Sequence, residues 1–373
     1  MRKNIIIKAL VLGSIGCAFT ITGMAANGHG QGYADSTTEV NGAKHEAVRS
    51  NWMDRTDITV GAQSKMGAQV FVETLQPLTH YDENSKSVFF VQGGIGKGGQ
   101  EDKASYFSGG NGGFWYPYNP ITKKGEQRYR PEEHHDTKSL GTVANVGLGY
   151  RVLSKHEHAY VGINTFYDHS FSKKYNRISG GLEYVSGLNE VRANIYKGLN
   201  SIKSEPYNVP LYEGYFEFLL DGGPAGYTVY KSQKALSGYD VSYARTFKNA
   251  RWARAYVGAY HWNGLGVKTH GEGPALALNV GKSHGWQAGT TLQLTPHVSL
   301  DVGYTSDNNH SSGAYGFVKY TLGTSKFAWH GGKHSDDTIT NARARMLDKV
   351  DRSPMRVGNT YEEFWMVVPY DHL

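Results

Sequence analysis

The stretch "NTFYDHSFSKKYNRISGGLEY", residues 164–184, forms two alternating arms around a polar turn at residues 168–175. The apolar side chains of the two arms are Ile163, Phe166 and Tyr167 before the turn and Ile178, Leu182 and Tyr184 after it. The polar side chains beside them are Asn164, Arg177, Ser179 and Glu183. This second set is too polar for the inner face of a soluble β-sandwich. The hairpin is therefore expected to turn its apolar face to lipid and its polar face to a wet interior.

The N-terminus predicts export from the cytoplasm. The residues "MRKNIIIKALVLGSIGCAFTITGMAA" have a basic start, an apolar centre and a small-x-small end at Gly23 and Ala25, as a secretory signal peptide does. Cleavage after Ala25 removes Cys17, the single cysteine of the 373-residue chain. We therefore expect a mature protein with neither a disulfide nor a thiol nucleophile.

Composition excludes several other classes of protein. Only 39% of the chain is hydrophobic, glycine (47 residues) and tyrosine (26 residues) are abundant, and long amphipathic helical patterns are almost absent. Loss of the signal peptide leaves 36 of the 39 basic residues against 33 acidic ones, a net charge of +3 that does not favour nucleic acid. No later stretch approaches the ~20 apolar residues of a membrane helix, so an exported chain of this kind can cross a membrane as a closed β-barrel.

Twelve segments alternate between apolar and polar residues over about the 9–11 residues that a membrane strand needs. They are residues 57–65, 68–78, 87–96, 139–153, 159–169, 175–186, 189–199, 237–247, 253–262, 285–295, 297–306 and 313–323. Their connections alternate between short and long, and single-chain bacterial barrels have an even number of strands. The sequence thus predicts an all-β fold, a twelve-stranded antiparallel transmembrane β-barrel. The alternative, a soluble all-β protein, would place more valine and leucine on its inner faces.

This interpretation divides the chain into four parts. Residues 1–25 are the signal peptide, 26–54 a periplasmic N-terminal segment, 55–323 the outer-membrane barrel, and 324–373 a linker-like tail. The short turns are expected in the periplasm and the long loops outside the cell.

The alternation also assigns faces to particular side chains. Residues expected to face lipid are Leu140, Val146, Leu148, Tyr150, Leu182, Val191 and Ile195, with Tyr160, Tyr167, Tyr184, Tyr304 and Tyr320 in the aromatic girdles. Residues expected to line the lumen are Arg151, Asn164, Arg177, Glu183, Glu190, Arg192, Asn194 and Asp301.

Several motifs, in order, resemble the β-domain of the intimin/invasin family, the inverse autotransporters. They are "NVGLGYR", "VGINTFYDHSFSKKYNRISGGLEY", "VRANIYKGL", "GYDVSYARTF", "ARAYVGAYHW" and "AGTTLQLTPHVSLDVGYTSDNNHSSGAYGFVKY". The resemblance covers roughly residues 55–357. It implies a barrel whose C-terminal linker runs back through the lumen and displays a passenger outside. "NARARMLDKVDRSPMRVG" (341–358) resembles that linker, which places Arg343, Arg345, Lys349 and Arg352 in the lumen beside carboxylates such as Glu183, Glu190 and Asp301.

The chain departs from the family pattern after the linker. About sixteen residues follow, "GNTYEEFWMVVPYDHL", where relatives continue into long adhesive passengers. Ser353, Pro354 and Met355 replace the family's polar run. We therefore expect a barrel that lacks the family's passenger, and whose final "FWMVV" (364–368) is either an exposed tag or a plug.

Other motifs are weaker indications of chemistry. Asp168-His169 resembles the Asp and His that activate water in outer-membrane proteases, but neighbours on a strand point to opposite faces. "EEHHD" (132–136) is expected to be a solvated loop rather than a metal site, and "GIGKGG" (94–99) lacks the following helix of a phosphate loop. We expect no catalytic residue, no cofactor and no metal.

An aromatic loop is the remaining candidate for contact with a partner. "YFSGGNGGFWYPYNP" (106–120) either packs into the barrel mouth or offers Phe114, Trp115, Tyr116 and Tyr118 to a host-cell protein or glycan.

Three functions stay open: a transport and anchoring barrel of inverse-autotransporter type, a stand-alone adhesin that acts through its loops, and a diffusion pore. The expected partners are outer-membrane lipid and the barrel-assembly machinery, and no nucleic acid.

Overall fold

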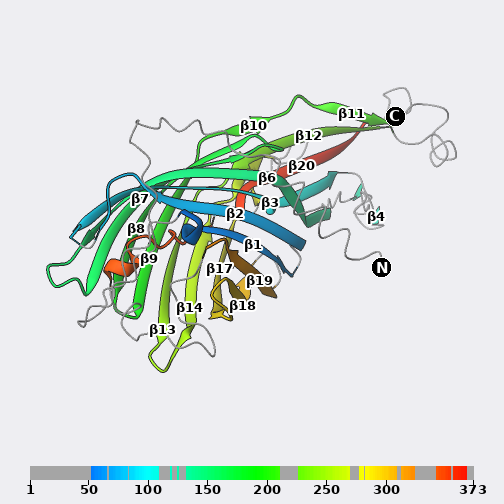
Figure 1. The fold of residues 1–373 in the computed structure, drawn as a ribbon. Coiled ribbons are helices and arrows are strands. Elements are labelled where there is room, and N and C mark those ends of the chain that lie inside the picture. The colour runs from blue at the N-terminus through cyan, green and yellow to red at the C-terminus, as the bar shows by residue number, and fades with distance from the viewer. Residues whose placement is uncertain are drawn as a thin grey trace, which may run out of the picture. The chain divides into compact units, whose positions relative to one another are not determined.

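Alternation along the strands produces a closed antiparallel β-barrel of twelve strands in the computed structural model (Figure 1). The predicted fold class is confirmed. The structure describes residues 52–64, 67–82, 84–108, 118–119, 124–125, 132–210, 226–268, 277–280, 282–308, 312–323, 342–353 and 356–367. The predicted signal peptide lies outside these residues, as does most of the predicted N-terminal segment.

The wall contains twelve strands, each hydrogen-bonded to the next and joined in a ring where β3 meets β6 and β1 meets β19. In ring order they are β1 (Thr56–Gln63), β2 (Gly67–Pro77), β3 (Ser87–Ser108), β6 (Glu132–Leu153), β7 (Ala159–Ser170), β8 (Tyr175–Ser186), β9 (Asn189–Gly198), β13 (Gly238–Phe247), β14 (Ala250–Trp262), β17 (Ser283–Gln293), β18 (Val298–Asp307) and β19 (Gly313–Thr321). Each corresponds to one of the twelve predicted segments. Because every wall strand is paired on both sides, the wall has no free edge, as a membrane requires.

The two ends of the barrel differ in their connections. One end, here called the turn end, carries η1 (Trp52–Arg55) and the short connections at residues 78–86, 154–158, 187–188, 248–249 and 294–297. The other, the loop end, carries the long connections and several further strands. These are β4 (Tyr118–Asn119) with β5 (Lys124–Gly125), β15 (Leu265–Lys268) with β16 (Ala277–Val280), and β10 (Ser201–Lys203), β11 (Tyr207–Pro210) and β12 (Gly226–Ala235).

Two wall strands and the tail depart from the predicted bounds. β3 and β6 are each 22 residues long and pair from Ser87–Val152 to Phe107–Glu132. "EEHHD" therefore lies in a strand and not in the predicted loop, and the predicted strand that contains the start of "GIGKGG" continues through this motif. After η2 (Arg343–Arg345), the tail forms β20 (Arg356–Val367) between β12 and the distal part of β3. Figure 1 shows β20 in red beside these two strands.

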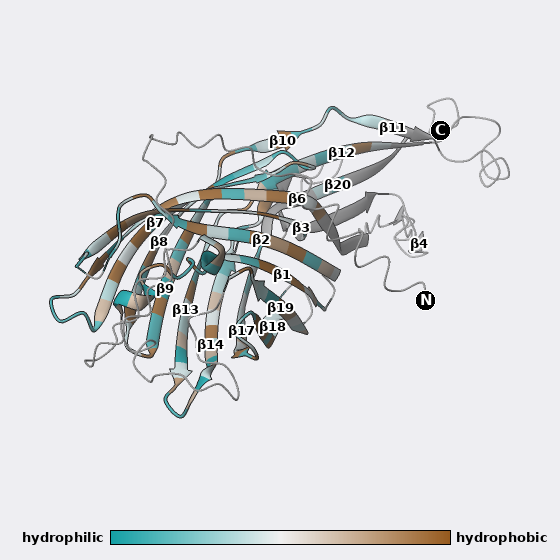
Figure 2. Cartoon of the chain, in the orientation of Figure 1, coloured by the Kyte–Doolittle hydropathy of each residue, from teal (hydrophilic) through white to brown (hydrophobic). Residues whose placement is uncertain are grey.

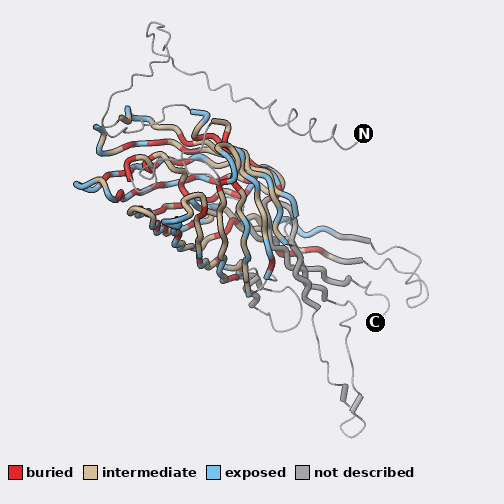
Figure 3. The backbone as a smooth tube through the Cα atoms, turned by 60° about the horizontal axis from the view of Figure 1, so that its bottom comes forward, coloured by how far each residue is buried: buried red, intermediate tan, exposed pale blue. Residues whose placement is uncertain are grey.

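Burial follows the alternation that the sequence predicts. Along β7, β8 and β9, buried and exposed residues alternate almost without interruption (Figure 3). Ile195 is 68% exposed and Leu182 is 61% exposed, and hydrophobic bands recur on the wall strands (Figure 2). The apolar side chains thus cover the outer surface, and the polar ones fill the interior. Among the described residues, no helix is long and apolar enough to cross a membrane.

Three apolar side chains face inward, contrary to the predicted faces. Leu140 is buried against Val143 and Tyr175, because the ladder between β3 and β6 shifts its register around Gly141 and so reverses the faces beyond it. Tyr160 and Phe166 also point into the barrel. Each lies under an arginine guanidinium, which makes an aromatic ring useful in a polar interior.

Inward-facing glycines make room for large aromatic rings inside the barrel, such as that of Phe90. A Cβ atom on Gly149 would lie 2.1 Å from Cζ of Phe90, whereas a Cβ atom on the outward-facing Gly180 would meet nothing closer than 3.9 Å. We expect Gly149→Ala to lower the free energy of unfolding by about 1–3 kcal/mol through overpacking. Gly180→Ala is the matched control and should be nearly neutral. Denaturant unfolding in detergent checks both, and equal effects would contradict this packing.

Candidate functional site

The lumen is lined by a dense polar wall on β6 to β9. Its side chains Arg151, Asn164, Arg177, Glu183, Glu190, Arg192 and Asn194 are all buried. Buried charges require partners, because desolvation of an ionised group is unfavourable. Here the partners come partly from the wall itself and partly from the linker, residues 342–353, which lies inside the barrel.

At the turn end, the linker begins with Arg343. Its guanidinium donates hydrogen bonds to Glu157 in the β6–β7 turn at 2.6 and 3.0 Å, and it also donates to the carbonyl oxygens of Asp82 and Ser85. The Tyr81 hydroxyl donates to the Arg343 carbonyl at 2.7 Å. Burial raises the pKa of Tyr81, so its phenol keeps the proton that it donates. The linker is thereby held to two turns at once.

This contact gives a pH prediction. Hydrogen bonds from Arg343 and Lys86 lower the pKa of Glu157 to about 2, below the ~4.3 of an unpaired glutamate. The folded-state pKa is depressed, so the pair's stabilisation is complete above about pH 4.3 and is lost as the pH falls toward 2. Acid titration of unfolding should show this loss, and Glu157→Gln should remove that part of the pH dependence. An unchanged profile in the variant would contradict it.

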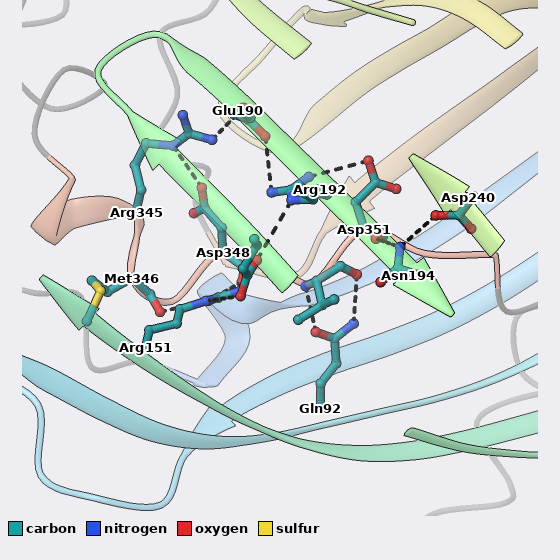
Figure 4. A network of polar contacts seen from close by, with 12 residues as sticks. Gln92, Arg151, Glu190, Arg192, Asn194, Asp240, Arg345, Met346, Asp348 and Asp351 are labelled. Atoms are coloured by element: carbon teal, nitrogen blue, oxygen red, sulfur yellow. Dashed lines mark hydrogen bonds and ion pairs between the residues drawn. The ribbon is translucent and has the colours of Figure 1, made fainter. Parts of the chain in front are cut away.

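Two residues further along the linker, Arg345 enters a charge cluster on β9 (Figure 4). Its Nη2 lies 2.5 Å from Oε1 of Glu190, and the side chains of both residues are only 2% exposed. Glu190 also accepts from Arg192 at 3.1 Å and from Arg254 at 3.0 Å. Asp348 of the linker binds the other side of Arg345 at 3.0 Å. A single carboxylate thus joins two wall arginines to the linker.

Arg151 on β6 holds the linker through its backbone. Its Nη1 donates to the carbonyl oxygens of Met346 and Asp348 at 2.7 and 2.6 Å, while its other nitrogens bind Glu183 at 2.6 and 3.0 Å. The guanidinium carbon lies 4.5 Å from the ring centre of Phe90. Because Glu183 and Phe90 fix the fork of this arginine, it presents its remaining donors to the linker in a set geometry.

Side chains from several strands form hydrogen bonds and ion pairs with the middle of the linker. Gln92 of β3 bonds both the N–H of Val350, at 2.8 Å, and its carbonyl oxygen, at 3.4 Å. Lys349 donates to Asp57 of β1 on the opposite side of the barrel. Asp351 accepts from Arg192 at 3.3 Å, and its carbonyl oxygen accepts from Asn194 at 3.2 Å.

The linker ends its path near the loop end, at Arg352 and Ser353. Arg352 donates to Asp168 of β7, which also accepts from Arg177 at 2.8 Å, and the Arg352 guanidinium lies 4.3 Å from the ring centre of Phe166. Arg177 donates in turn to the Ser353 carbonyl at 2.6 Å. Asp168 therefore joins the linker to the wall toward the loop end, as Glu190 does toward the turn end.

Four linker cations thus contact four different carboxylates, the first three toward the turn end and the last toward the loop end. The pairs are Arg343 with Glu157, Arg345 with Glu190, Lys349 with Asp57, and Arg352 with Asp168. Four such pairs favour one register of the linker over shifted ones.

Of the three carboxylates that the sequence singled out as partners, Glu190 meets a linker arginine. Glu183 is occupied by Arg151 of the wall, and Asp301 accepts a hydrogen bond from Tyr256 at 2.7 Å. The sequence analysis missed Asp57 and Glu157, which lie at the turn end of strands. Charges at those positions look like ordinary solvated ends, so no sequence signal marked them.

The weaker motifs do not converge on chemistry. Asp168 points into the barrel, while His169 bonds Asn176 at 2.8 Å, so the two do not form a dyad. Among the residues that the structure describes, no cluster of three metal-binding side chains occurs. Phe114, Trp115 and Tyr116 lie outside these residues, and of Tyr118 only the backbone, in β4, is described.

Comparison with known proteins identifies the family. A family model described as inverse autotransporter, β-domain, matches residues 132–354. No curated protein matches the sequence.

Solved structures resemble the chain distantly. A Bordetella autotransporter β-domain is 7% identical over 71% of this chain and 97% of its own, with a TM-score of 0.26. An active-site mutant of Escherichia coli outer membrane phospholipase A is 10% identical over 75% and 95%, with a TM-score of 0.35. A membrane protein from work on in-meso crystallization is 13% identical over 82% and 99%, with a TM-score of 0.48.

The matched residues make up more than half of the chain and include the polar wall and the linker. The protein therefore belongs to the inverse autotransporter β-domain family, and its barrel lies in the lipid of the bacterial outer membrane.

Proposed function

We propose that this barrel anchors its linker in the lumen and carries the segment that follows to the cell surface, as a non-enzymatic component of type V secretion. The observation that supports this most directly is the set of four linker cations, the first three paired with carboxylates toward the turn end and the last with one toward the loop end. A chain bound in this way has one direction and one register. In this proposal, the signal peptide exports the chain and the barrel-assembly machinery inserts it.

Surface labelling tests the proposal. A cysteine at Asp371, near the C-terminus, should react with a membrane-impermeant maleimide on intact cells. Two single-cysteine controls set the sides of the membrane: Lys174→Cys in the exposed β7–β8 turn at the loop end, and Lys155→Cys in the exposed β6–β7 turn at the turn end. Lys174→Cys should label on intact cells, and Lys155→Cys only after the outer membrane is permeabilised. If Asp371→Cys, like Lys155→Cys, labels only after the outer membrane is permeabilised, the proposal is overturned.

A second candidate function, a diffusion pore, is favoured by a separate observation. Inside the barrel the Asp351 side chain is 53% exposed, and the Lys319 side chain on β19 is 38% exposed. The linker thus contacts β1 to β3 and β6 to β9 and leaves water-accessible surface near β19.

Conductance in planar bilayers measures this path. Deletion of residues 341–373 should raise the single-channel conductance over that of the full chain, because a twelve-stranded wall encloses more space than side chains alone fill. Equal conductance of the two forms would count against a lumen occupied by the linker. High conductance of the full chain would favour the pore over the anchor.

Adhesion is a further proposal, with a host-cell protein or glycan as the partner of the loop-end segments. It rests on the aromatic composition of residues 106–120. The test compares binding to whole host cells by the full chain and by protein that lacks residues 106–120. Equal binding by the two would remove that basis.

A further inference from the structure

The tail enters a second binding site after it leaves the lumen. β20 pairs with β12 from Gly358–Ala235 to Val367–Gly226 in antiparallel fashion. Its other edge pairs in parallel with β3, from Arg356–Gln100 to Trp365–Ser108. The segment is therefore hydrogen-bonded along both edges.

The site between β3 and β12, here called the slot, arises because β3 changes its pairing partner along its length. Residues 90–97 of β3 pair with β2 of the wall, and residues 100–108 pair with β20 on that same edge. Gly98 lies between the two parts, with a φ of 97°, and a Cβ atom there would lie 2.3 Å from the Ala68 carbonyl oxygen. A glycine is needed at this position, because the backbone turns away from β2 there. Without β20, this edge of β3 would present unpaired main-chain groups.

Both neighbours of β20 are covalently continuous with strands of the barrel wall. β3 continues directly into its wall portion, and β12 joins the wall strand β13 through Leu236 and Ser237. Leu236 is buried against Tyr196 and Trp262. On β20 itself, Tyr361 is buried and Glu362 pairs with Lys231 of β12 at 3.4 Å. The slot is thus connected to the barrel at two points.

We propose that the gap between β3 and β12 is a strand-binding site for an extended chain segment, occupied by residues 356–367, and that it bears tension applied to the exported C-terminus. This rests on the proposed function. β20 runs parallel to β3, whose direction is from the turn end to the loop end. Ladder hydrogen bonds lie across the strands, so a pull along β20 loads all of them together rather than one after another. The force then passes into two wall strands.

Disulfide trapping tests the site in the full chain, whose only native cysteine, Cys17, lies in the predicted signal peptide. Gln233 and Thr360 are directly opposed, whereas Thr228 opposes Trp365 instead. Opposed Cα atoms about 5 Å apart are within disulfide reach. Gln233→Cys with Thr360→Cys should therefore cross-link on mild oxidation. Thr228→Cys with Thr360→Cys, five positions out of register, should not. Cross-linking of both pairs, or of neither, would overturn the proposed site.

Single-molecule pulling tests the mechanical role, with the purified chain in a supported bilayer and a handle at the C-terminus. Because the 12 residues of β20 are already extended, their release should lengthen the tether by only a few ångströms, so the quantity measured is the force of the first rupture event. The Gln233→Cys, Thr360→Cys pair should raise this force when oxidised and restore it when reduced. Thr360→Pro, which removes one ladder donor, should lower the rupture force. Thr360→Val is the control and should keep it.

Absence of a rupture event before the wall unfolds in the full chain, or the same force in the proline variant, would overturn the proposal. These measurements need no cell, so they can fail while surface labelling succeeds. They can also succeed if the labelling fails, and the two proposals are therefore separable.

Discussion

Replacing Glu190 by glutamine is expected to lower the free energy of unfolding by about 3–5 kcal/mol, the effect of breaking a buried ion pair. Glu190 is the common partner of Arg345, Arg192 and Arg254. Without its charge, three cations remain close together in a part of the barrel from which solvent is largely excluded. Denaturant unfolding in detergent measures the loss, and heat modifiability on a gel should show a lower transition temperature.

Glu205 gives the matched control. It is an exposed carboxylate between β10 and β11, and Glu205→Gln should change the free energy of unfolding by no more than about 0.5 kcal/mol. Arg345→Met separates the linker's part, because it leaves Glu190 with its two wall arginines and should be milder than Glu190→Gln. An effect of Glu190→Gln as small as that of the Glu205 control would show that the cluster does not hold the linker.

The second large effect is expected on the outer face of the wall. Ile195→Lys should lower the free energy of unfolding by about 2–4 kcal/mol, as a lysine does near the middle of the bilayer. Ile195 is among the most exposed large hydrophobic residues, and it lies opposite Tyr239 of β13 and Gly180 of β8. A lysine there must either enter hydrocarbon or distort the bilayer.

The control for this change lies on the inner face. Gln287 of β17 opposes Gly258 and is exposed, with its side chain within 3.5 Å of the position of a Cβ atom on that inward-facing glycine. Gln287→Lys places the same charge in water-accessible lumen and should be nearly neutral. Refolding into bilayers of one lipid composition allows comparison of the two variants. Equal losses would mean that the assignment of faces is wrong.

The wall of the barrel was predictable because alternation is a local property. Each strand shows its two faces within about ten residues, and the exposure of Leu182 and Ile195 follows from their own segments. The errors have two origins. A register shift near Gly141 breaks the local rule and reverses the face of Leu140. Tyr160 and Phe166 obey the alternation of β7, whose even-numbered residues face inward, and the error there was to place aromatic side chains outside by residue type.

The linker's partners were only partly predictable. Lys349 meets Asp57 across 292 positions, and Arg343 meets Glu157 across 186. Charge alone identified linker cations and wall carboxylates as complementary, which was enough to name Glu190. It did not show that Arg151 already occupies Glu183, because that depends on which side chains are adjacent across β6, β7 and β8. The aromatic and glycine-rich segments carried no pattern from which a contact follows.

By itself, the sequence determined the all-β class, the twelve membrane strands, the inner and outer faces of most of them, and the resemblance to a family. These follow from period, length and composition, which each segment carries alone. The tertiary structure decided which carboxylate each linker cation meets and that residues 356–367 pair with β3 and β12. The physical reason is the same for both. A closed barrel brings together residues that are distant in sequence. Main-chain pairing of a strand is nearly independent of its side chains. No local sequence pattern therefore indicates either result.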